Sequence, residues 1–196
     1  MFFRSKKIYT VNTYGADILK KPSDEIKEIT PEIRKIAEEM ILTTALFDGI
    51  GLAGPQYGIN KRIVALAVPY PEQTAISPGE ALLLPRMPMV IINPEIIALS
   101  ETTECAEEGC LSVPEIYAPV ERPQFVQFRA QTLDGELIEC ECGGLLGRCI
   151  QHEIDHLNGI LFVDRLTEET FSVIESKLKK LKKSDSKKDF KQTIRV

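Results

Sequence analysis

The two histidines of this 196-residue chain, which has no others, lie four positions apart in His152-Glu153-Ile154-Asp155-His156. On a helix, positions i and i+4 share a face, so both imidazoles can bind one metal ion. Glu153, one step around the helix from His152, can reach a water molecule bound to that ion. The H-E-x-x-H spacing is typical of metal-dependent hydrolases for this physical reason.

A catalytic metal usually takes three protein ligands and keeps one position for water, so the histidines need a partner from elsewhere. The candidates are the carboxylates and five cysteines: Cys105, Cys110, Cys140, Cys142 and Cys149. Cys110 stands out because Gly109 before it allows close approach of the backbone. The odd number of cysteines favours reduced thiols over a disulfide framework. Cys140 and Cys142 are spaced too closely for the usual structural metal site and would share one face of a strand.

The length and composition bound the possibilities. A chain of 196 residues is long enough for one substantial core and short for two, so we expect one domain. No stretch approaches the roughly 20 apolar residues that a membrane helix needs. The N-terminus has charge without an apolar segment behind it, which argues against a secretory signal. We therefore expect a cytoplasmic protein that does not contact a membrane or DNA.

Local signals predict the elements before the H-E-x-x-H segment. Thr30-Pro31-Glu32 is a good helix start, and Asp48-Gly49 ends that helix. Residues 61–68 and 89–97 are rich in branched side chains and predict strands. The proline-rich residues 69–88 between them predict a long loop.

The second half contains a hairpin and two helices. Residues 126–132 alternate up to Asp134-Gly135, and the chain returns from Leu137 as a second strand. The H-E-x-x-H helix follows, and we expect it to be bounded by Gly143-Gly144 in front and Asn158-Gly159 behind. Last comes an amphipathic helix with an apolar stripe formed by Phe171, Ile174, Leu178 and Leu181.

The charge is unevenly distributed. Residues 177–196 contain eight lysines and one arginine against two aspartates, a balance of +7, while the net charge of the chain is −5. The remainder therefore carries −12. A basic end on an acidic body indicates either a solvated lysine face or an electrostatic contact with an anionic partner such as ribosomal RNA.

The order of the elements predicts an α+β fold. We expect a single compact domain, with small antiparallel or mixed sheets around a central H-E-x-x-H helix and with N-terminal and C-terminal helices. Residues 1–184 should form the catalytic domain, and residues 185–196 should form a basic, frayed tail.

Three segments together give the chain a specific resemblance. It is similar to the peptide deformylases, which carry G-x-G-x-A-x-P-Q, E-G-C-L-S and H-E-x-D-H segments in that order. Here these are residues 49–56, 108–112 and 152–156, and the resemblance covers about residues 14–165. It implies a hydrolase that removes the formyl group from N-formylmethionyl nascent polypeptides and releases formate. In some members of the family the C-terminal helix contacts the ribosome.

The resemblance also implies roles for individual residues. Cys110, His152 and His156 would bind one divalent ion, with water as the fourth ligand. Glu153 would act as general base and acid in the attack by metal-bound hydroxide. The Gln56 amide and the Leu111 backbone N–H would stabilise the oxyanion. The substrate-binding residues would be Ile50, Gly51, Glu108, Leu145, Arg148 and Cys149.

The metal is open to more than one prediction. The resemblance favours Fe2+, whereas one thiolate with two imidazoles also suits Zn2+. Ni2+ or Co2+ could substitute.

Two other functions fit the histidine pair alone. An H-E-x-x-H endopeptidase would take its third ligand from downstream acids, of which there are four: Asp164, Glu168, Glu169 and Glu175. A noncatalytic module would close its structural site with Cys110 and Cys149 beside the two histidines. The first leaves the segments around Gln56 and Cys110 unexplained, and the second leaves Glu153 without a role.

Overall fold

The computed structural model describes residues 7–71, 77–186 and 189–196. Its helices are α1 (Pro31–Leu46), α2 (Gly54–Tyr57), α3 (Pro78–Leu83), α4 (Gly144–Leu157) and α5 (Glu168–Asp185), with short 3-10 turns at Asp17–Lys20, Leu84–Arg86 and Phe162–Arg165. Its strands are β1 (Ile8–Asn12), β2 (Gly51–Ala53), β3 (Ile63–Leu66), β4 (Met89–Leu99), β5 (Thr103–Cys110), β6 (Val113–Pro123), β7 (Val126–Thr132), β8 (Leu137–Cys142) and β9 (Lys191–Arg195). This is the predicted α+β fold.

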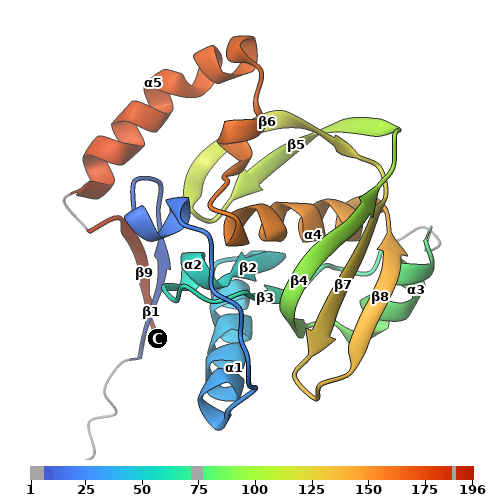
Figure 1. Cartoon of the computed structure of the whole chain (residues 1–196). Coiled ribbons are helices and arrows are strands. Elements are labelled where there is room, and N and C mark those ends of the chain that lie inside the picture. Colours follow the sequence, from blue (N-terminus) through green and yellow to red (C-terminus); the bar gives the residue numbers. More distant parts are fainter. Residues whose placement is uncertain (1–6, 72–76, 187–188) are drawn as a thin grey trace, which may run out of the picture.

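The strands form three antiparallel sheets, with β2-β3-β4-β7-β8 as the largest and β5-β6 and β1-β9 as two-stranded ribbons. The helix α4 crosses the centre of the molecule between the large sheet and the β5-β6 hairpin (Figure 1). The expectation of a central H-E-x-x-H helix is therefore confirmed.

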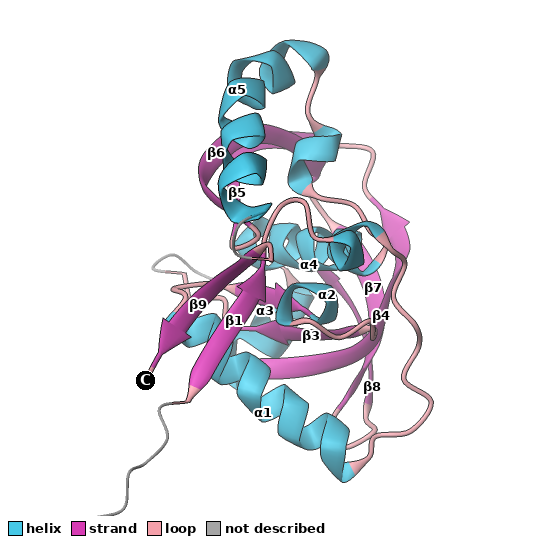
Figure 2. Ribbon diagram, turned by 90° about the vertical axis from the view of Figure 1, so that its left-hand side faces the viewer, coloured by secondary structure: helices cyan, strands magenta, loops and turns pink. Residues whose placement is uncertain are grey.

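At β3 the large sheet is covered on both faces. Ile63 and Ala65 belong to the apolar cluster that contains α1, whereas Val64 and Leu66 belong to the cluster that contains α4. Successive side chains of a strand point to opposite faces, so a strand between two helical layers must be apolar at every position. All four residues of β3 are buried. Figure 2 shows α1 and α4 on opposite sides of these strands.

The N-terminal helix begins as predicted. The Thr30 hydroxyl accepts a hydrogen bond from the Ile33 N–H, and Pro31 occupies the first helical position. Ala37 and Met40 then pack against the sheet. The predicted hairpin at Asp134-Gly135 is also confirmed, as the pairing of β7 with β8.

The segment 69–88 differs from the predicted loop. Ser77 caps α3, because its hydroxyl accepts from the Glu80 N–H while the Glu80 carboxylate accepts from the Ser77 N–H. The same hydroxyl accepts from the Gly143 N–H at 3.1 Å, at the start of α4. The prolines in this segment led to the prediction of a loop, although Ser77 and Glu80 form a capping box that begins a helix. Through Ser77, the segment also holds the beginning of α4 in place. Residues 72–76 lie outside the described residues.

The C-terminal region also differs from the prediction. Ile174 and Leu178 of α5 are buried against β6 and the turn at Phe162–Arg165, as the apolar stripe predicts. The tail, however, is not frayed over its whole length, since Lys191–Arg195 form β9 and pair with β1 from Ile8↔Arg195 to Asn12↔Lys191. The backbone hydrogen bonds of this pairing outweigh the low apolar content of the tail.

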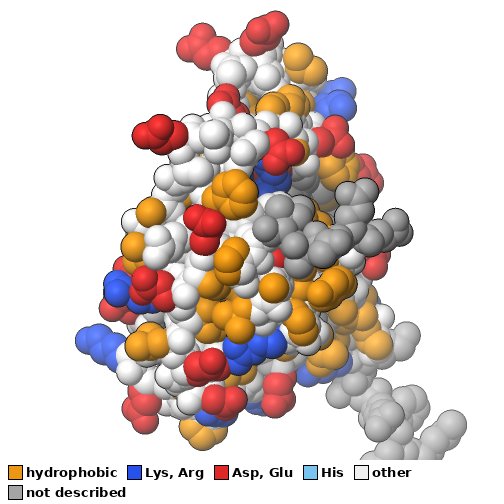
Figure 3. Space-filling model, turned by 90° about the vertical axis from the view of Figure 1, so that its right-hand side faces the viewer, with side chains coloured by type: hydrophobic (Ala, Val, Ile, Leu, Met, Phe, Trp, Pro, Cys, Tyr) orange, Lys and Arg blue, Asp and Glu red, His pale blue; other side chains and the backbone are white. Residues whose placement is uncertain are grey.

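The surface is mixed in character. On the face to the right of Figure 1, hydrophobic side chains gather among acidic and basic ones (Figure 3). Leu82 of α3 and Leu137 of β8 are among the exposed large apolar residues. In the described part of the chain, no helix combines the length and apolar character needed to cross a membrane.

Candidate active site and metal centre

The three predicted ligands come together from distant parts of the chain. Cys110 lies at the end of β5, and His152 and His156 lie one turn apart on α4. One donor atom from each of the three falls within 4.8 Å of the others, and Cys110 Sγ is 3.2 Å from His156 Nε2. Within residues 7–71, 77–186 and 189–196, this is the only such group of metal-ligating side chains.

The chemistry of this group fits a divalent ion. One sulfur and two imidazole nitrogens form a three-ligand set that leaves a position for water. The His156 Nδ1 atom is buried and has no hydrogen-bond partner among the described residues. Burial holds the pKa of His156 well below its ordinary value, so this imidazole is neutral and able to bind a metal.

A buried charge network orients His152. Its Nδ1–H donates to the Glu108 carboxylate at 2.9 Å, which turns Nε2 toward Cys110. Glu108 also accepts from the Arg122 guanidinium at 2.5 and 2.9 Å and from Arg148 at 2.9 Å. Burial opposes ionisation of Glu108, but the hydrogen bonds from His152 and Arg122 outweigh it and hold its pKa well below the usual range.

The charge network extends from Glu108 to Asp155 of α4. Arg122 donates to Asp155 at 2.8 Å, and Asp155 also pairs with Arg165. Asp155 lies three residues after His152, so the two side chains are neighbours on the surface of α4. Ion pairs thus connect the β5-β6 hairpin, α4 and the turn at Phe162–Arg165 next to the metal ligands.

Glu153 lies on the wall of the pocket beside the ligands. Burial raises its pKa to about 7, in the range that suits a general base near neutral pH. Its Oε2 atom has no hydrogen-bond partner among the described residues. Gly51 of β2 passes so close that a Cβ there would lie 2.8 Å from the Glu153 Cδ and 2.9 Å from the Cys149 sulfur. A glycine is therefore required at position 51 to leave room for the carboxylate.

The Gln56 amide is held in one orientation. Its Oε1 accepts from the Ala53 N–H at 2.7 Å, and its Nε2 therefore faces Cys110 Sγ at 3.4 Å and Ser112 Oγ at 3.3 Å. Leu111 occupies the tight turn that joins β5 to β6. Both residues line the pocket beside the metal ligands.

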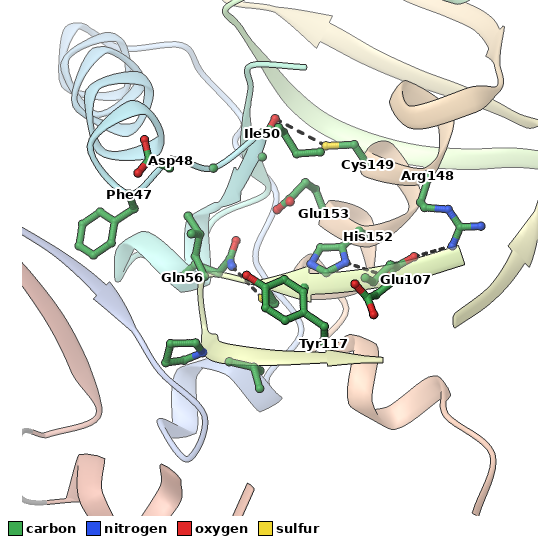
Figure 4. Close-up of a pocket in the computed structure, with 18 of the residues that line it drawn as sticks. Phe47, Asp48, Ile50, Gln56, Glu107, Tyr117, Arg148, Cys149, His152 and Glu153 are labelled. Atoms are coloured by element: carbon green, nitrogen blue, oxygen red, sulfur yellow. Dashed lines mark hydrogen bonds and ion pairs between the residues drawn. The ribbon is translucent and has the colours of Figure 1, made fainter. Parts of the chain in front are cut away.

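The site opens into a pocket of about 450 Å³. Eleven of the twelve predicted site residues line it: Ile50, Gly51, Gln56, Glu108, Cys110, Leu111, Leu145, Arg148, Cys149, His152 and Glu153. His156 is buried behind His152. The described residues 77–88 are not part of the lining. Figure 4 shows Glu153, His152 and Gln56 around one space, with Ile50 and Cys149 above it and Tyr117 across it.

The structure adds residues that the sequence did not indicate. Three of them lie directly beside segments that the sequence did indicate, so their position in the sequence could have suggested them: Phe47, Asp48 and Gly109. Tyr117 and Gln192 also line it but belong to β6 and β9, and no sequence pattern connects them to the site. Arg122 was missed for the same reason.

The alternative ligand sets do not form. Asp164 accepts from the Leu161 N–H at 2.7 Å and pairs with Lys20, away from the histidines. The Cys149 thiol lies 3.7 Å from the Ile50 carbonyl oxygen instead of joining Cys110. Among the described residues, neither a downstream acid nor Cys149 joins the group formed by Cys110 and the two histidines.

Fold and site together define a class of protein. An H-E-x-x-H helix, a thiolate from a separate strand and a pocket with buried acid and amide groups define a metal-dependent hydrolase. The family whose sequence model is described as Polypeptide deformylase matches residues 8–172.

Individual relatives agree with this match. The chain is 44% identical over 162 residues to peptide deformylase 2 of Gloeobacter violaceus, covering 83% of this chain and 81% of the relative. It is 45% identical over 150 residues to the peptide deformylase of Nitrobacter hamburgensis, covering 76% and 82%. The crystal structure of a peptide deformylase from Synechococcus elongatus in complex with actinonin superposes with a TM-score of 0.74 at 36% identity, covering 86% and 85%. For a Plasmodium falciparum peptide deformylase the TM-score is 0.79 at 30% identity, covering 90% and 96%.

The chain belongs to the polypeptide deformylase family. It is a metal-dependent enzyme that removes an N-terminal formyl group, and neither the endopeptidase nor the structural module is favoured.

Glu108→Gln should expose the contribution of the buried charge network. The substitution leaves Arg122 and His152 facing a neutral amide, and we expect a loss of roughly 3–5 kcal/mol of unfolding free energy at pH 7. The ionised Glu108 stabilises the fold above its usual pKa of 4.5, and this contribution is lost as the pH falls below that value toward its lower folded-state pKa. The wild type should therefore lose stability between about pH 5 and 3 more steeply than the variant, by up to about 1.4 kcal/mol per pH unit.

Urea unfolding of both proteins at equal metal loading, from pH 7 to pH 3, measures this difference. Glu107→Gln is the matched control, because Glu107 is the exposed neighbour and should change stability by less than about 0.5 kcal/mol. Parallel pH curves for wild type and Glu108→Gln would contradict the prediction.

Proposed function

We propose that this chain removes the formyl group from N-formylmethionyl nascent polypeptides and that the residues described above carry out the reaction. The observation that supports this most is the convergence of Cys110, His152 and His156 beside the buried carboxylate of Glu153. A metal, a base and a pocket on one side of the metal are what hydrolysis of a small amide requires.

The proton transfers are assigned to Glu153. A bound divalent ion would lower the pKa of a coordinated water and polarise the formyl carbonyl. Glu153 takes the proton of the attacking water and later delivers it to the leaving amine. Its pKa of about 7 allows both steps near neutral pH.

We assign stabilisation of the negative charge that develops on the formyl oxygen to two hydrogen-bond donors. The Gln56 amide cannot rotate away, because its oxygen is held by the Ala53 N–H. The Leu111 N–H lies on the turn directly after Cys110. Donors fixed before the reaction stabilise a developing oxyanion without reorganisation, and removal of one typically costs roughly 10²–10³ in turnover.

The methionine side chain is assigned to the apolar part of the pocket. Ile50 and Leu145 stand at its mouth, and Cys149 is buried deeper. The Arg148 guanidinium is held by Glu108 and by the carbonyls of Glu104 and Val120, so its aliphatic stem faces the pocket. Glu108, expected from the resemblance to bind substrate, is proposed instead to position His152, because its oxygens are engaged in the network.

We propose Fe2+ as the native ion, with Zn2+ as the alternative and Ni2+ or Co2+ as substitutes. The thiolate and two imidazoles accept all of these ions. Metal analysis of protein purified without oxygen should find iron bound, and activity should decline on exposure to air. Zinc at full occupancy with activity stable in air would contradict Fe2+.

The setting of the reaction follows from the substrate. Nascent polypeptides are made in the cytoplasm, where we propose that the enzyme acts. We propose that the catalytic domain, expected over residues 1–184, also includes β9, because Gln192 of that strand lines the pocket. We also propose that the lysines of α5 contact the ribosome, because five of them are exposed on one helix: Lys177, Lys179, Lys180, Lys182 and Lys183.

The central test is formate release from formyl-Met-Ala-Ser by metal-loaded protein, with casein as the substrate of an endopeptidase. We expect formate release without casein cleavage. Glu153→Ala should keep its metal and lose turnover by roughly 10²–10⁴-fold, because it removes the proton carrier and no ligand.

Cys110→Ala is the contrasting variant. It removes a ligand and should lose the metal itself, as measured by metal content after gel filtration. Metal loss in Glu153→Ala, or full occupancy in Cys110→Ala, would show that the roles are wrongly assigned.

Reversal of charge on α5 tests the ribosome contact. Lys177, Lys180 and Lys183 should be changed together to Glu, because truncation of α5 would also expose the core around Ile174. We expect affinity for ribosomes at about 0.1 M salt to fall at least about tenfold, with a shallower salt dependence. Release of formate from formyl-Met-Ala-Ser should be unchanged. Lys27→Glu with Lys35→Glu, on exposed positions elsewhere, is the control; equal affinity of all three proteins would rule out the contact.

A further inference from the structure

The last strand of the chain reaches the active-site turn. Gln192 of β9 lines the pocket, and its side-chain Nε2 donates to the Leu111 carbonyl oxygen at 2.7 Å. The match to the deformylase family ends at residue 172. Gln192 therefore lies beyond the residues that the family model matches.

The peptide bond that Gln192 holds is in the centre of the site. Its carbonyl belongs to Leu111, and its N–H belongs to Ser112 and points to Cys110 Sγ at 3.4 Å. The Ser112 carbonyl, in turn, accepts from the Tyr14 N–H at 2.7 Å. Two hydrogen bonds from outside the hairpin thus fix the turn that carries both the thiolate and the proposed oxyanion donor.

Gln192 is itself fixed by the strand around it. It pairs with Val11 in the β1-β9 ribbon, and the Thr13 N–H donates to the Phe190 carbonyl at 2.7 Å. The Phe190 ring covers Gly15, where a Cβ would lie 2.6 Å from the ring carbon Cδ1. Gln192 faces inward, whereas its neighbours Lys191 and Thr193 are exposed.

We propose that Gln192 is a positioning residue for deformylation: by donating to the Leu111 carbonyl, it anchors the backbone of Leu111, so that the N–H of this residue, on the preceding Cys110–Leu111 peptide, stays directed at the formyl oxygen. The inference rests on the proposed role of Leu111. A shift of the Leu111 backbone would misdirect a donor that matters in the transition state, so loss of Gln192 should lower kcat and leave KM nearly unchanged.

The test compares two variants that separate hydrogen bonding from packing. Gln192→Ala removes both the donor and the bulk of the side chain. Gln192→Glu keeps the size and shape but places an acceptor against the Leu111 carbonyl. If donation matters, both variants should lose kcat by about tenfold, Gln192→Glu at least as much as Gln192→Ala, with KM within about twofold.

Thr193→Ala, on the exposed side of the same strand, is the matched control and should keep wild-type kcat. Hydrogen exchange of the peptide spanning residues 109–113 provides a readout independent of turnover. Exchange there should be faster in both Gln192 variants and unchanged in the control.

A kcat of Gln192→Glu within twofold of wild type would show that only packing matters and would overturn the proposal. Unchanged exchange at residues 109–113 would do the same. A wild-type chain that releases no formate from formyl-Met-Ala-Ser would instead overturn the proposed function, so the two failures are distinguishable.

Discussion

The arrangement of the site depends on one buried carboxylate. Glu108 is 6% exposed, yet it remains charged because Arg122, Arg148 and His152 surround it with donors. A buried ion is tolerated only when its partners satisfy it, and loss of one partner leaves an uncompensated charge. This requirement fixes the position of the β5-β6 hairpin on α4. Cys110, two residues after Glu108, is thereby delivered to the histidines.

The other wall of the site is set by close packing. β2 is the edge strand of the large sheet, and at Gly51 its backbone runs against Glu153. The sheet packs its apolar face on α4, so the helix cannot shift away from the strand without opening the core around Leu146 and Ile150. One face of α4 is thus held by apolar contacts and another by charge, and the metal ligands lie between them.

Much of the fold and of the site could be predicted from the sequence. The predictions that were confirmed are those for which the sequence carries a local signal. The α1 start at Thr30, the β7-β8 turn and the bounds of α4 follow from local signals, namely a hydroxyl cap, an Asp-Gly turn and flanking glycines. Segment resemblance identified Cys110, which spacing alone left among several candidates. The helix after Ser77 was hidden by prolines that favour a loop in general but also suit a first helical turn. Gln192 reaches the site through the pairing of β9 with β1 from the other end of the chain. Arg122 and Tyr117 reach it because the β5-β6 hairpin packs against α4, and no local pattern encodes either arrangement.

The tail shows most clearly how tertiary pairing overrides composition. A segment rich in lysine and poor in apolar residues has little hydrophobic reason to order by itself. Here it follows α5, whose Ile174 and Leu178 are buried, so the chain is delivered beside β1 already close to its partner. Because the packed helix α5 already brings β9 close to β1, the backbone hydrogen bonds between the two strands form at a lower entropic cost. The segment after β1 then contacts the Cys110–Ser112 turn through Tyr14, and β9 contacts it through Gln192. The two ends of the chain therefore meet at the turn that carries the thiolate, and the order of the tail and the geometry of the site are coupled.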